Sequence, residues 1–257
     1  MSVKSDPGGY PQRKASEIPL VSAIQMREIQ GVAQEDYGID ILQIMENGGR
    51  SAAELALAML GGRGRGQRIV ILAGGGNKGG AGLCAARHLS NWGFQVQPVF
   101  AEVESEMSFV PRRQVQILRS AGIADPDEEV SEYTVEQQLD AADLVIDALV
   151  GYGLQGPPSG MASAVVELAL AARKPILALD VPTGINATTG EISTPAIRAT
   201  TTLTLDLPKQ GLLAPAARSQ VGALYLADIG IPRVVHQRLG IRIDGIYNDG
   251  PIIRIRR

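Results

Sequence analysis

The sequence predicts an α/β fold, with a mainly parallel sheet and helices on both of its faces. The chain has 257 residues and is 45% hydrophobic, and a chain of this length buries roughly 70–75% of its unfolded surface. Short, β-branched apolar runs alternate with helical stretches through the middle of the chain, which is the pattern of parallel strands joined through helices. Glycine-rich loops follow two of these runs, at the edge where such sheets bind ligands.

Two helices are expected before this alternation begins. Ser22 stands three residues before Gln25, the spacing of a capping box, and Gly38 provides a stop signal. Asp40 repeats the same spacing with Gln43 and opens an alanine-rich second helix.

The strands are expected at the short apolar runs, and helices at the periodic stretches between them. The strand candidates are residues 68–73, 95–100, 143–149, 175–180, 200–205 and 223–227. Helices are expected over residues 80–92, 109–121 and 162–172. Because helices that connect parallel strands cover both faces of the sheet, we expect a three-layer sandwich.

Three segments are expected along the chain. Residues 1–19 are rich in Pro, Gly, Ser and Lys and predict a flexible tail, whereas residues 20–240 form one domain. Residues 241–257 alternate Ile and Arg. This C-terminal extension is either a hairpin or edge strand, or a partly ordered segment.

Composition excludes several classes of protein. The formal net charge is −3 and the pI is about 5.5, which argues against a nucleic-acid partner. The single cysteine cannot form an internal disulfide. No apolar run approaches the roughly 20 residues of a membrane helix, and the polar start lacks a signal sequence. We therefore expect a cytoplasmic protein with no membrane partner.

Polar residues stand where the expected strands end. The segment 74–82 after the first strand is glycine-rich, which lets the backbone approach a ligand. The third strand ends at Asp147 and is followed by a loop over residues 151–157, and the fourth ends at Asp180 before Pro182, Thr183 and Gly184. Carboxyl ends of parallel strands share one edge, so the two aspartates predict a single polar site.

The first glycine loop also matches a dinucleotide-binding pattern. Gly74, Gly76 and Gly79 have the G-x-G-x-x-G spacing, and Glu102 stands where a ribose-binding acid is expected. An NAD-dependent oxidoreductase is therefore one open alternative, although it leaves Asp147 and Asp180 unexplained.

Five sequence blocks in order resemble the YjeF N-terminal domain family, which comprises the NAD(P)H-hydrate epimerases. The blocks are residues 46–50, 74–82, 147–151, 180–184 and 208–212, within a resemblance that spans about residues 21–231. The resemblance implies a Rossmann-like fold, a homodimer, and an isomerase that interconverts the epimers of hydrated NADH and NADPH. It also implies a role in metabolite repair, with a nucleotide-like substrate and a potassium ion rather than a redox cofactor.

The resemblance implies the site residues as well. The substrate-binding positions are Asn77, Lys78, Gly79, Gly80, Ala81, Gly151, Tyr152, Gly153, Leu154, Gln155, Gly156, Pro157 and Asp180. Asp180 is the acid–base candidate, because a carboxylate can move protons and stabilise a developing cation. Asp147 and Thr183 match two positions that hold the potassium ion.

Two residues depart from the family pattern. Lys78 replaces an asparagine potassium ligand, and an ammonium has no lone pair for a metal. We therefore hypothesise that the Lys78 ammonium replaces the ion between Asp147 and Thr183. Ala81 replaces an aspartate. Both departures keep open a second function, that of a non-catalytic scaffold for a nucleotide-like ligand or a protein partner.

Other polar residues have simpler expected roles. Glu46 and Asn47 either face the site or bond to the adjacent loop. Cys84 is expected to be a buried thiol, and His88 and His236 to be structural. No zinc site is expected, because the histidines lack an obvious partner at ligand spacing.

Overall fold

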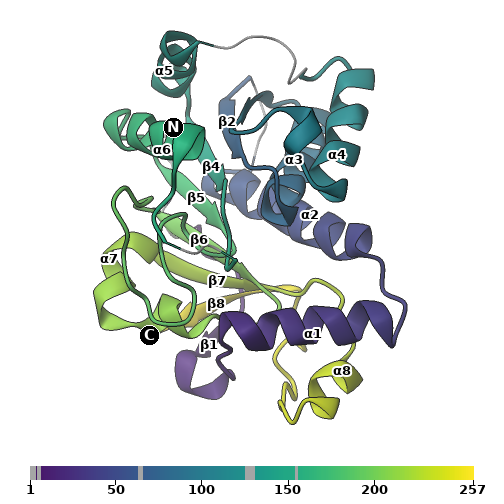
Figure 1. Ribbon diagram of the computed structural model, residues 1–257. Coiled ribbons are helices and arrows are strands. Elements are labelled where there is room, and N and C mark those ends of the chain that lie inside the picture. The colour runs from purple at the N-terminus through teal and green to yellow at the C-terminus, as the bar shows by residue number, and fades with distance from the viewer. Residues whose placement is uncertain (1–3, 5–6, 63–65, 125–130, 154–155) are drawn as a thin grey trace.

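A computed structural model describes residue 4 and residues 7–62, 66–124, 131–153 and 156–257. Within these residues the chain forms an eight-stranded sheet with the strand order β1-β8-β7-β6-β5-β4-β2-β3 (Figure 1). The strands are β1 (Gln12–Lys14), β2 (Arg68–Ala73), β3 (Gln95–Phe100), β4 (Leu144–Ala148), β5 (Ile176–Leu179), β6 (Thr201–Leu205), β7 (Ala223–Ala227) and β8 (Ile252–Arg256). Neighbouring strands are parallel except for β7 and β8, which are antiparallel. The predicted fold class is confirmed.

The five helices expected from the sequence lie close to their expected positions. The helices are α1 (Ala23–Glu35), α2 (Ile41–Met59), α3 (Asn77–Asn91), α4 (Phe109–Ser120), α5 (Glu132–Ala141), α6 (Gly160–Ala171), α7 (Arg218–Val221) and α8 (Arg233–Arg238), with short 3-10 turns at Ala15–Glu17, Glu104–Glu106, Gln210–Leu213 and Pro215–Ala217. Three of them, α5, α7 and α8, were not expected. Both predicted capping boxes form, at Ser22 and Asp40. Helix α3 begins earlier than expected, because the glycine loop runs directly into it. None of the described helices has the length and hydropathy needed to cross a membrane.

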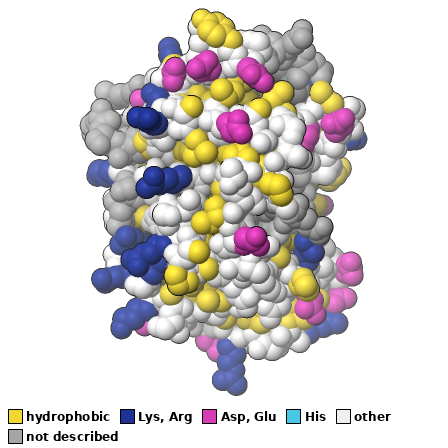
Figure 2. Space-filling view, turned by 60° about the vertical axis from the view of Figure 1, so that its left-hand side comes forward, with side chains coloured by type: hydrophobic (Ala, Val, Ile, Leu, Met, Phe, Trp, Pro, Cys, Tyr) yellow, Lys and Arg dark blue, Asp and Glu magenta, His cyan; other side chains and the backbone are white. Residues whose placement is uncertain are grey.

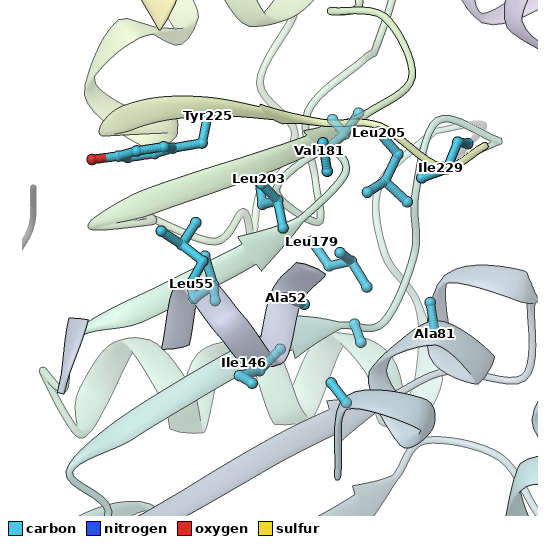
Figure 3. Packing of buried hydrophobic residues seen from close by; sticks show 14 of the residues in the cluster. Ala52, Leu55, Ala81, Ile146, Leu179, Val181, Leu203, Leu205, Tyr225 and Ile229 are labelled. Carbon is cyan, nitrogen blue, oxygen red and sulfur yellow. The ribbon is translucent and has the colours of Figure 1, made fainter. Parts of the chain in front are cut away.

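The sheet is buried on both faces, and alternate side chains of each strand enter different cores. On β2, Ile69 and Ile71 belong to the core beneath α2 and α3, whereas Val70 and Leu72 face the core beneath α5 and α6. Figure 3 shows the first core, where Ala52 and Leu55 of α2 lie over the sheet residues Ile146 and Leu179. Helices on both faces of the sheet make the predicted three-layer sandwich.

Small residues let α2 and α3 pack tightly. A Cβ atom at Gly49 would lie 2.5 Å from the Ala81 carbonyl oxygen and 2.6 Å from the Cys84 Cβ atom. Any side chain at position 49 would therefore force the two helices apart. Since α3 follows the glycine loop, this contact also positions the loop.

The prediction of a flexible tail over residues 1–19 is wrong where the structure describes it. Residues 12–14 form β1, which pairs in parallel with β8. Tyr10 packs edge-on against the Tyr225 ring, with the ring centroids 5.4 Å apart, and Ile18 is buried. The segment is polar because an edge strand of three residues has few buried side chains. Sequence periodicity therefore had nothing to detect.

The C-terminal segment 241–257 is part of the same sheet. Strand β8 lies between β7 and β1, so it is an inner strand rather than an edge. Ile252, Ile253 and Ile255 are buried. The prediction of a strand in this segment is confirmed, but the strand is not at the edge of the sheet. Its inner position depends on pairing with β1, a strand that the sequence had not predicted.

A buried ion pair joins α8 to Asp206, the residue directly after β6. His236 of α8 lies with Nε2 at 2.9 and 3.0 Å from the two Asp206 carboxylate oxygens, and both residues are buried. The Tyr247 hydroxyl donates to the Asp206 carbonyl oxygen. Asp206 has a φ angle of 63°, a left-handed conformation that aspartate tolerates better than most residues.

The described surface carries both signs of charge. Figure 2 shows one face, on which hydrophobic side chains form a broken band with lysine and arginine mainly on its left. Aspartate and glutamate lie along the top, near the centre and down the right-hand side of the same face. This face is therefore mixed in charge, unlike the single basic stripe typical of nucleic-acid binding.

The ion pair between His236 and Asp206 predicts a pH-dependent contribution to stability. Burial lowers the pKa of His236, but the hydrogen bond and charge of Asp206 outweigh it and raise the pKa, helped by Asp228. Tyr247 stays neutral, since burial raises its pKa well above the ordinary value. A raised histidine pKa stabilises the fold below the unfolded pKa of about 6.5, and this stabilisation is lost as the pH rises through the folded pKa.

His236→Gln should therefore lower the free energy of unfolding more at about pH 6 than at about pH 9. Urea unfolding followed by circular dichroism at both pH values measures the difference. Gln237→Ala, an exposed change on the same helix, is the control. It should change the free energy of unfolding by the same amount at both pH values. An equal cost of His236→Gln at both pH values would contradict the assignment.

Candidate functional site

A cavity of about 470 Å³ opens at the carboxyl ends of β2, β4, β5 and β6. It lies where the order of the sheet reverses, since β2 connects forward to β3 on one side and has β4 on its other side. Parallel sheets bind ligands at this kind of switch point. The lining residues are Arg27, Gln30, Met45, Gly75, Gly76, Asn77, Lys78, Glu102, Leu149, Val150, Gly151, Tyr152, Gly153, Asp180, Leu205 and Lys209.

The structure brings together only part of the expected substrate-binding set. Among the lining residues are six of them: Asn77, Lys78, Gly151, Tyr152, Gly153 and Asp180. Gly156 and Pro157 are not among the lining residues in the described part of the chain. Leu154 and Gln155 lie outside the described residues.

The remaining glycine-loop positions serve packing. A Cβ atom at Gly79 would lie 1.8 Å from the Gly74 carbonyl oxygen, and one at Gly80 would lie 2.5 Å from a Val110 methyl group. Ala81 is fully buried in the core that α2 covers (Figure 3). Of the described residues, these three are absent from the cavity lining. Gly79 and Gly80 therefore allow close packing of the backbone, and the Ala81 methyl group lies in the core rather than at the cavity.

Helix α1 and the 208–212 block contribute residues that sequence reasoning missed. Arg27 and Gln30 of α1 and Lys209 line the cavity. The only signal for Lys209 was its place within a block of the family resemblance. Arg27 and Gln30 carried no local signal, because α1 reaches the site only through tertiary packing.

Asp147 and Thr183 form a fully buried polar bridge between β4 and the loop after β5. The Thr183 backbone N–H donates to Asp147 Oδ2 at 2.8 Å, and the Thr183 hydroxyl donates to Oδ1 at 2.7 Å. The Leu149 N–H donates to Oδ1 at 3.1 Å. The carboxylate therefore fixes the relative positions of both strand-end loops.

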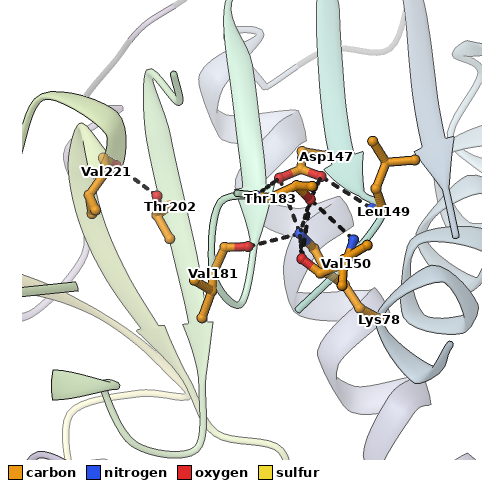
Figure 4. A network of polar contacts seen from close by, with 8 residues as sticks. All are labelled: Lys78, Asp147, Leu149, Val150, Val181, Thr183, Thr202 and Val221. Atoms are coloured by element: carbon orange, nitrogen blue, oxygen red, sulfur yellow. Dashed lines mark hydrogen bonds and ion pairs between the residues drawn. The ribbon is translucent and has the colours of Figure 1, made fainter. Parts of the chain in front are cut away.

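The Lys78 ammonium lies at the centre of this bridge (Figure 4). Its Nζ atom is 3.1 Å from Asp147 Oδ2, 3.1 Å from Thr183 Oγ1, 3.1 Å from the Val150 carbonyl oxygen and 2.8 Å from the Val181 carbonyl oxygen. Burial lowers the pKa of Lys78, while the charge and hydrogen bond of Asp147 oppose that shift. A potassium ion held by the same oxygens would coincide with this nitrogen, so these residues do not fit an ion in addition to Lys78.

Asp180 forms the second ion pair of the site. Lys209 Nζ donates to Asp180 Oδ1 at 2.5 Å and to the Leu205 carbonyl oxygen at 2.8 Å. The Leu205 N–H lies 3.3 Å from the same carboxylate oxygen. The other oxygen, Oδ2, is 3.5 Å from where a Cβ atom on Gly151 would lie. Asp180 is also among the residues that line the cavity.

The Asp180 backbone also adopts an unusual conformation. Its φ angle is 65°, in the left-handed region that disfavours most residues. The turn directs the chain out of β5 toward Thr183, and the side chain toward Lys209. Such strain at a buried polar residue is typical of functional sites.

Tyr152 provides an aromatic wall. Its hydroxyl donates to Gln30 Oε1 at 2.5 Å, and Lys209 Nζ lies 5.7 Å from the ring centroid. Burial raises the pKa of Tyr152 to about 12, and the negative charge of Asp180 adds to that shift. The phenol is therefore neutral near pH 7 and acts as a hydrogen-bonding group.

Glu102 lies over the glycine loop. A Cβ atom at Gly75 would come 2.0 Å from Glu102 Oε2, so glycine at position 75 makes room for this carboxylate. Since both residues line the cavity, Glu102 supplies a hydrogen-bond acceptor beside the loop backbone.

Glu46 bonds to the adjacent helix rather than facing the cavity. Arg87 Nη2 lies 2.6 Å from both Glu46 oxygens, His88 Nε2 lies 2.9 Å from Oε1, and the Cys84 thiol lies 3.0 Å from Oε2. Burial raises the pKa of Glu46, but these three partners outweigh it and lower the pKa to about 2. Asn47 donates to the Ile229 carbonyl oxygen at 3.0 Å.

Glu46, Cys84 and His88 also have the donor types and spacing of a metal site. The prediction that the histidines have no such partner is therefore wrong for His88. A guanidinium already holds both oxygens of Glu46, and burial raises the pKa of the Cys84 thiol, with Glu46 adding to the shift. Cys84 is the expected buried thiol, and the cluster fastens α2 to α3.

Fold and cavity together define an α/β protein of the Rossmann-like class with a polar ligand site at the strand ends. The chain belongs to the family described as the YjeF-related protein N-terminus, whose family model matches residues 41–211. The family resemblance predicted from the five sequence blocks is confirmed.

Named relatives cover most of the chain. A protein named NAD(P)H-hydrate epimerase from Dehalogenimonas lykanthroporepellens is 41% identical over 88% of this chain and 87% of that protein. A protein of the same name from Rhodopirellula baltica is 36% identical over 84% of this chain and 86% of that protein. The bifunctional NAD(P)H-hydrate repair enzyme Nnr of Moorella thermoacetica is 35% identical over 83% of this chain, which corresponds to 41% of that protein. A crystal structure of the yeast protein YNL200c superposes with a TM-score of 0.79 and 25% identity, covering 92% of this chain and all of that one.

The ion pair between Lys209 and Asp180 predicts that substitutions of these two residues affect the free energy of unfolding non-additively. Lys209→Met should lower the free energy of unfolding by about 3–5 kcal/mol, because it leaves the buried Asp180 carboxylate without its cation. Adding Asp180→Asn in the same chain removes the unpaired charge, so the double variant should lose less than the sum of the two single losses. Urea unfolding of all four proteins measures the coupling. Additive losses would show that the two side chains do not form an ion pair.

Proposed function

We propose that this protein is an NAD(P)H-hydrate epimerase, an isomerase that interconverts the two epimers of hydrated NADH or NADPH. The observation that carries the proposal is the Asp180 carboxylate, which pairs with Lys209 and lines a cavity large enough for a ligand. The relatives named for this activity match the chain along nearly its whole length, which supports the same assignment.

Epimerisation requires inversion at a ring carbon next to nitrogen. The carbon–oxygen bond breaks as a proton reaches the departing oxygen, so that water leaves and an iminium-like cation remains. Water then adds to the opposite face and gives up a proton. Asp180 is suited to carry this proton, because it lines the cavity and general acid–base groups must lie within hydrogen-bond reach of the reacting atom. A carboxylate also stabilises the developing cation.

Other cavity residues suit the rest of a nucleotide. Arg27 is exposed at the cavity, and the first residues of α3, Asn77 and Lys78, also line it, so that a cation and a helix N-terminus lie together, a combination that favours phosphate groups. Tyr152 offers a flat ring for stacking. Glu102 offers an acceptor for a hydroxyl group, with the same physical role that it would have in a dinucleotide-binding loop.

A second candidate function is a non-catalytic scaffold that binds a nucleotide-like ligand or a protein partner. The buried Ala81, which stands where the family has an aspartate, favours it. The oxidoreductase alternative gains no comparable support, because it gives no role to the buried Asp147 and Asp180 networks.

We further propose that the protein is a homodimer that pairs through α1. Helix α2 is largely covered by its neighbours, with ten of its residues buried. Helix α1 instead exposes Ile24, which is 72% accessible. A cytoplasmic location without nucleic-acid or membrane partners remains a prediction from composition.

The epimerase proposal predicts a measurable rate. Purified protein should accelerate the equilibration of hydrated NADPH epimers, followed by NADPH absorbance through a dehydratase that consumes one epimer. Asp180→Asn should slow the reaction at least about 100-fold, as expected for removal of an acid–base group. Asp140→Asn, an exposed change on α5, should keep full activity. A rate equal to that of the protein-free control would favour the scaffold function instead.

The dimer proposal predicts a solution mass of twice 27.1 kDa by light scattering at tens of micromolar protein. Ile24→Glu should shift the protein toward the monomer, because it places a charge in an apolar interface. Met161→Glu, an exposed change on α6, should leave the mass unchanged. A monomer mass for the unaltered protein would refute the pairing.

A further inference from the structure

The oxygen cage around Lys78 has the geometry of a site for a single large cation. Four oxygens lie within 3.1 Å of the Lys78 nitrogen, but an ammonium has only three N–H groups to donate. There is one oxygen more than the ammonium can serve with its own N–H groups. The four oxygens are therefore arranged around the positive charge of the nitrogen, as they would be around a metal cation. Two of the four are backbone carbonyls, those of Val150 and Val181.

The size of the cage selects the kind of cation. Its 2.8–3.1 Å distances exceed the roughly 2.0–2.6 Å at which magnesium and calcium bind oxygen. One carboxylate, from Asp147, contributes a single negative charge to the four oxygens. The cage therefore suits a monovalent cation of about the size of an ammonium group, such as potassium or rubidium.

The aliphatic part of Lys78 lies beside the loop after β4. A Cβ atom on Gly151 would lie 3.4 Å from Lys78 Cδ and 3.5 Å from Lys78 Cβ, which is ordinary van der Waals contact. The Lys78 side chain is only 6% exposed. The Lys78 side chain extends from the start of α3, and its ammonium group is enclosed by the end of β4 and the loops that follow β4 and β5.

We propose that Lys78 is a tethered cation that permanently occupies a monovalent-cation site, so that this protein needs no potassium ion to order its ligand cavity. The ammonium joins three segments: the start of α3, the end of β4 with its following loop, and the loop after β5. All three carry cavity-lining residues. Lys78 is therefore a positioning residue for the site. Measurements of thermal stability test whether Lys78 occupies a cation site, and they do not depend on the activity of the protein. Any effect of Lys78 on turnover rests on the proposed epimerase function.

Thermal unfolding in different chloride salts at matched ionic strength tests the proposal. The unaltered protein should have the same Tm in potassium, sodium and tetramethylammonium chloride. Lys78→Ala should lower the Tm by roughly 10 °C in tetramethylammonium, because Asp147 loses its cation. Potassium, rubidium or ammonium should restore several degrees, with a shift that grows with the logarithm of the salt concentration. Sodium should restore less.

Two further variants separate the cage from general salt effects. Lys174→Ala removes a lysine beside the opposite end of β5 and should show no preference among the cations. Adding Thr183→Val to Lys78→Ala removes one cage oxygen and should weaken the potassium-specific recovery. A Lys78→Ala protein that is indifferent to the cation would overturn the proposal, as would a potassium-specific rise in the Tm of the unaltered protein.

Crystals of the unaltered protein soaked in rubidium provide a second measurement that does not depend on any variant folding. The expected result is no anomalous density between Asp147 and Thr183, with the ammonium in place. Rubidium density at that position with Lys78 displaced would overturn the tethered cation. Neither outcome depends on the epimerase assay, so failure of the proposed function and failure of this inference are distinguishable.

Discussion

The Asp147 carboxylate, buried completely and bonded on both oxygens, is the constraint on which the site depends. It sits at the end of a central strand and accepts from Thr183, Leu149 and Lys78. Isolated, such a charge costs several kcal/mol to bury. The Lys78 ammonium and the surrounding N–H groups offset that cost, and in doing so they hold together segments that are distant in the chain. The cavity exists in its present shape because these loops have little freedom to move apart.

A second buried ion pair joins Asp180 to Lys209, and its surroundings differ from those of Asp147. Asp147 is bonded within the protein through both oxygens, whereas Asp180 lines the cavity and pairs with Lys209 through Oδ1. The two strand-end aspartates therefore differ in their surroundings, since one is enclosed by protein groups and the other lies beside the cavity. The cavity adjoins Asp180, while the Lys78 ammonium and the Thr183 backbone occupy the space around Asp147.

Close packing explains why Gly79, Gly80 and Ala81 are not among the residues that line the cavity. Gly79 and Gly80 let the start of α3 pass against neighbouring backbone and against Val110, and Gly49 lets α2 lie on α3. Helix α3 carries Lys78 near its beginning and the Glu46 partners Arg87 and His88 near its end. The same rigid helix therefore connects the cation cage to the first core, and its position determines both.

The sequence by itself determined the parallel sheet, most strand positions, the two helix caps and the strand-end aspartates, since these depend on local periodicity, capping and short motifs. It identified Lys78 and Thr183 as neighbours of Asp147 only through the family resemblance. Tertiary structure decided the rest. Strand β1 and the inner position of β8 exist because they pair with each other, a contact across most of the chain length. Arg27, Gln30 and Lys209 reach the cavity through packing, and Glu46 and Ala81 turn away from it. Local patterns carry no information about such distant neighbours, because the energy that selects them is released only when the elements assemble.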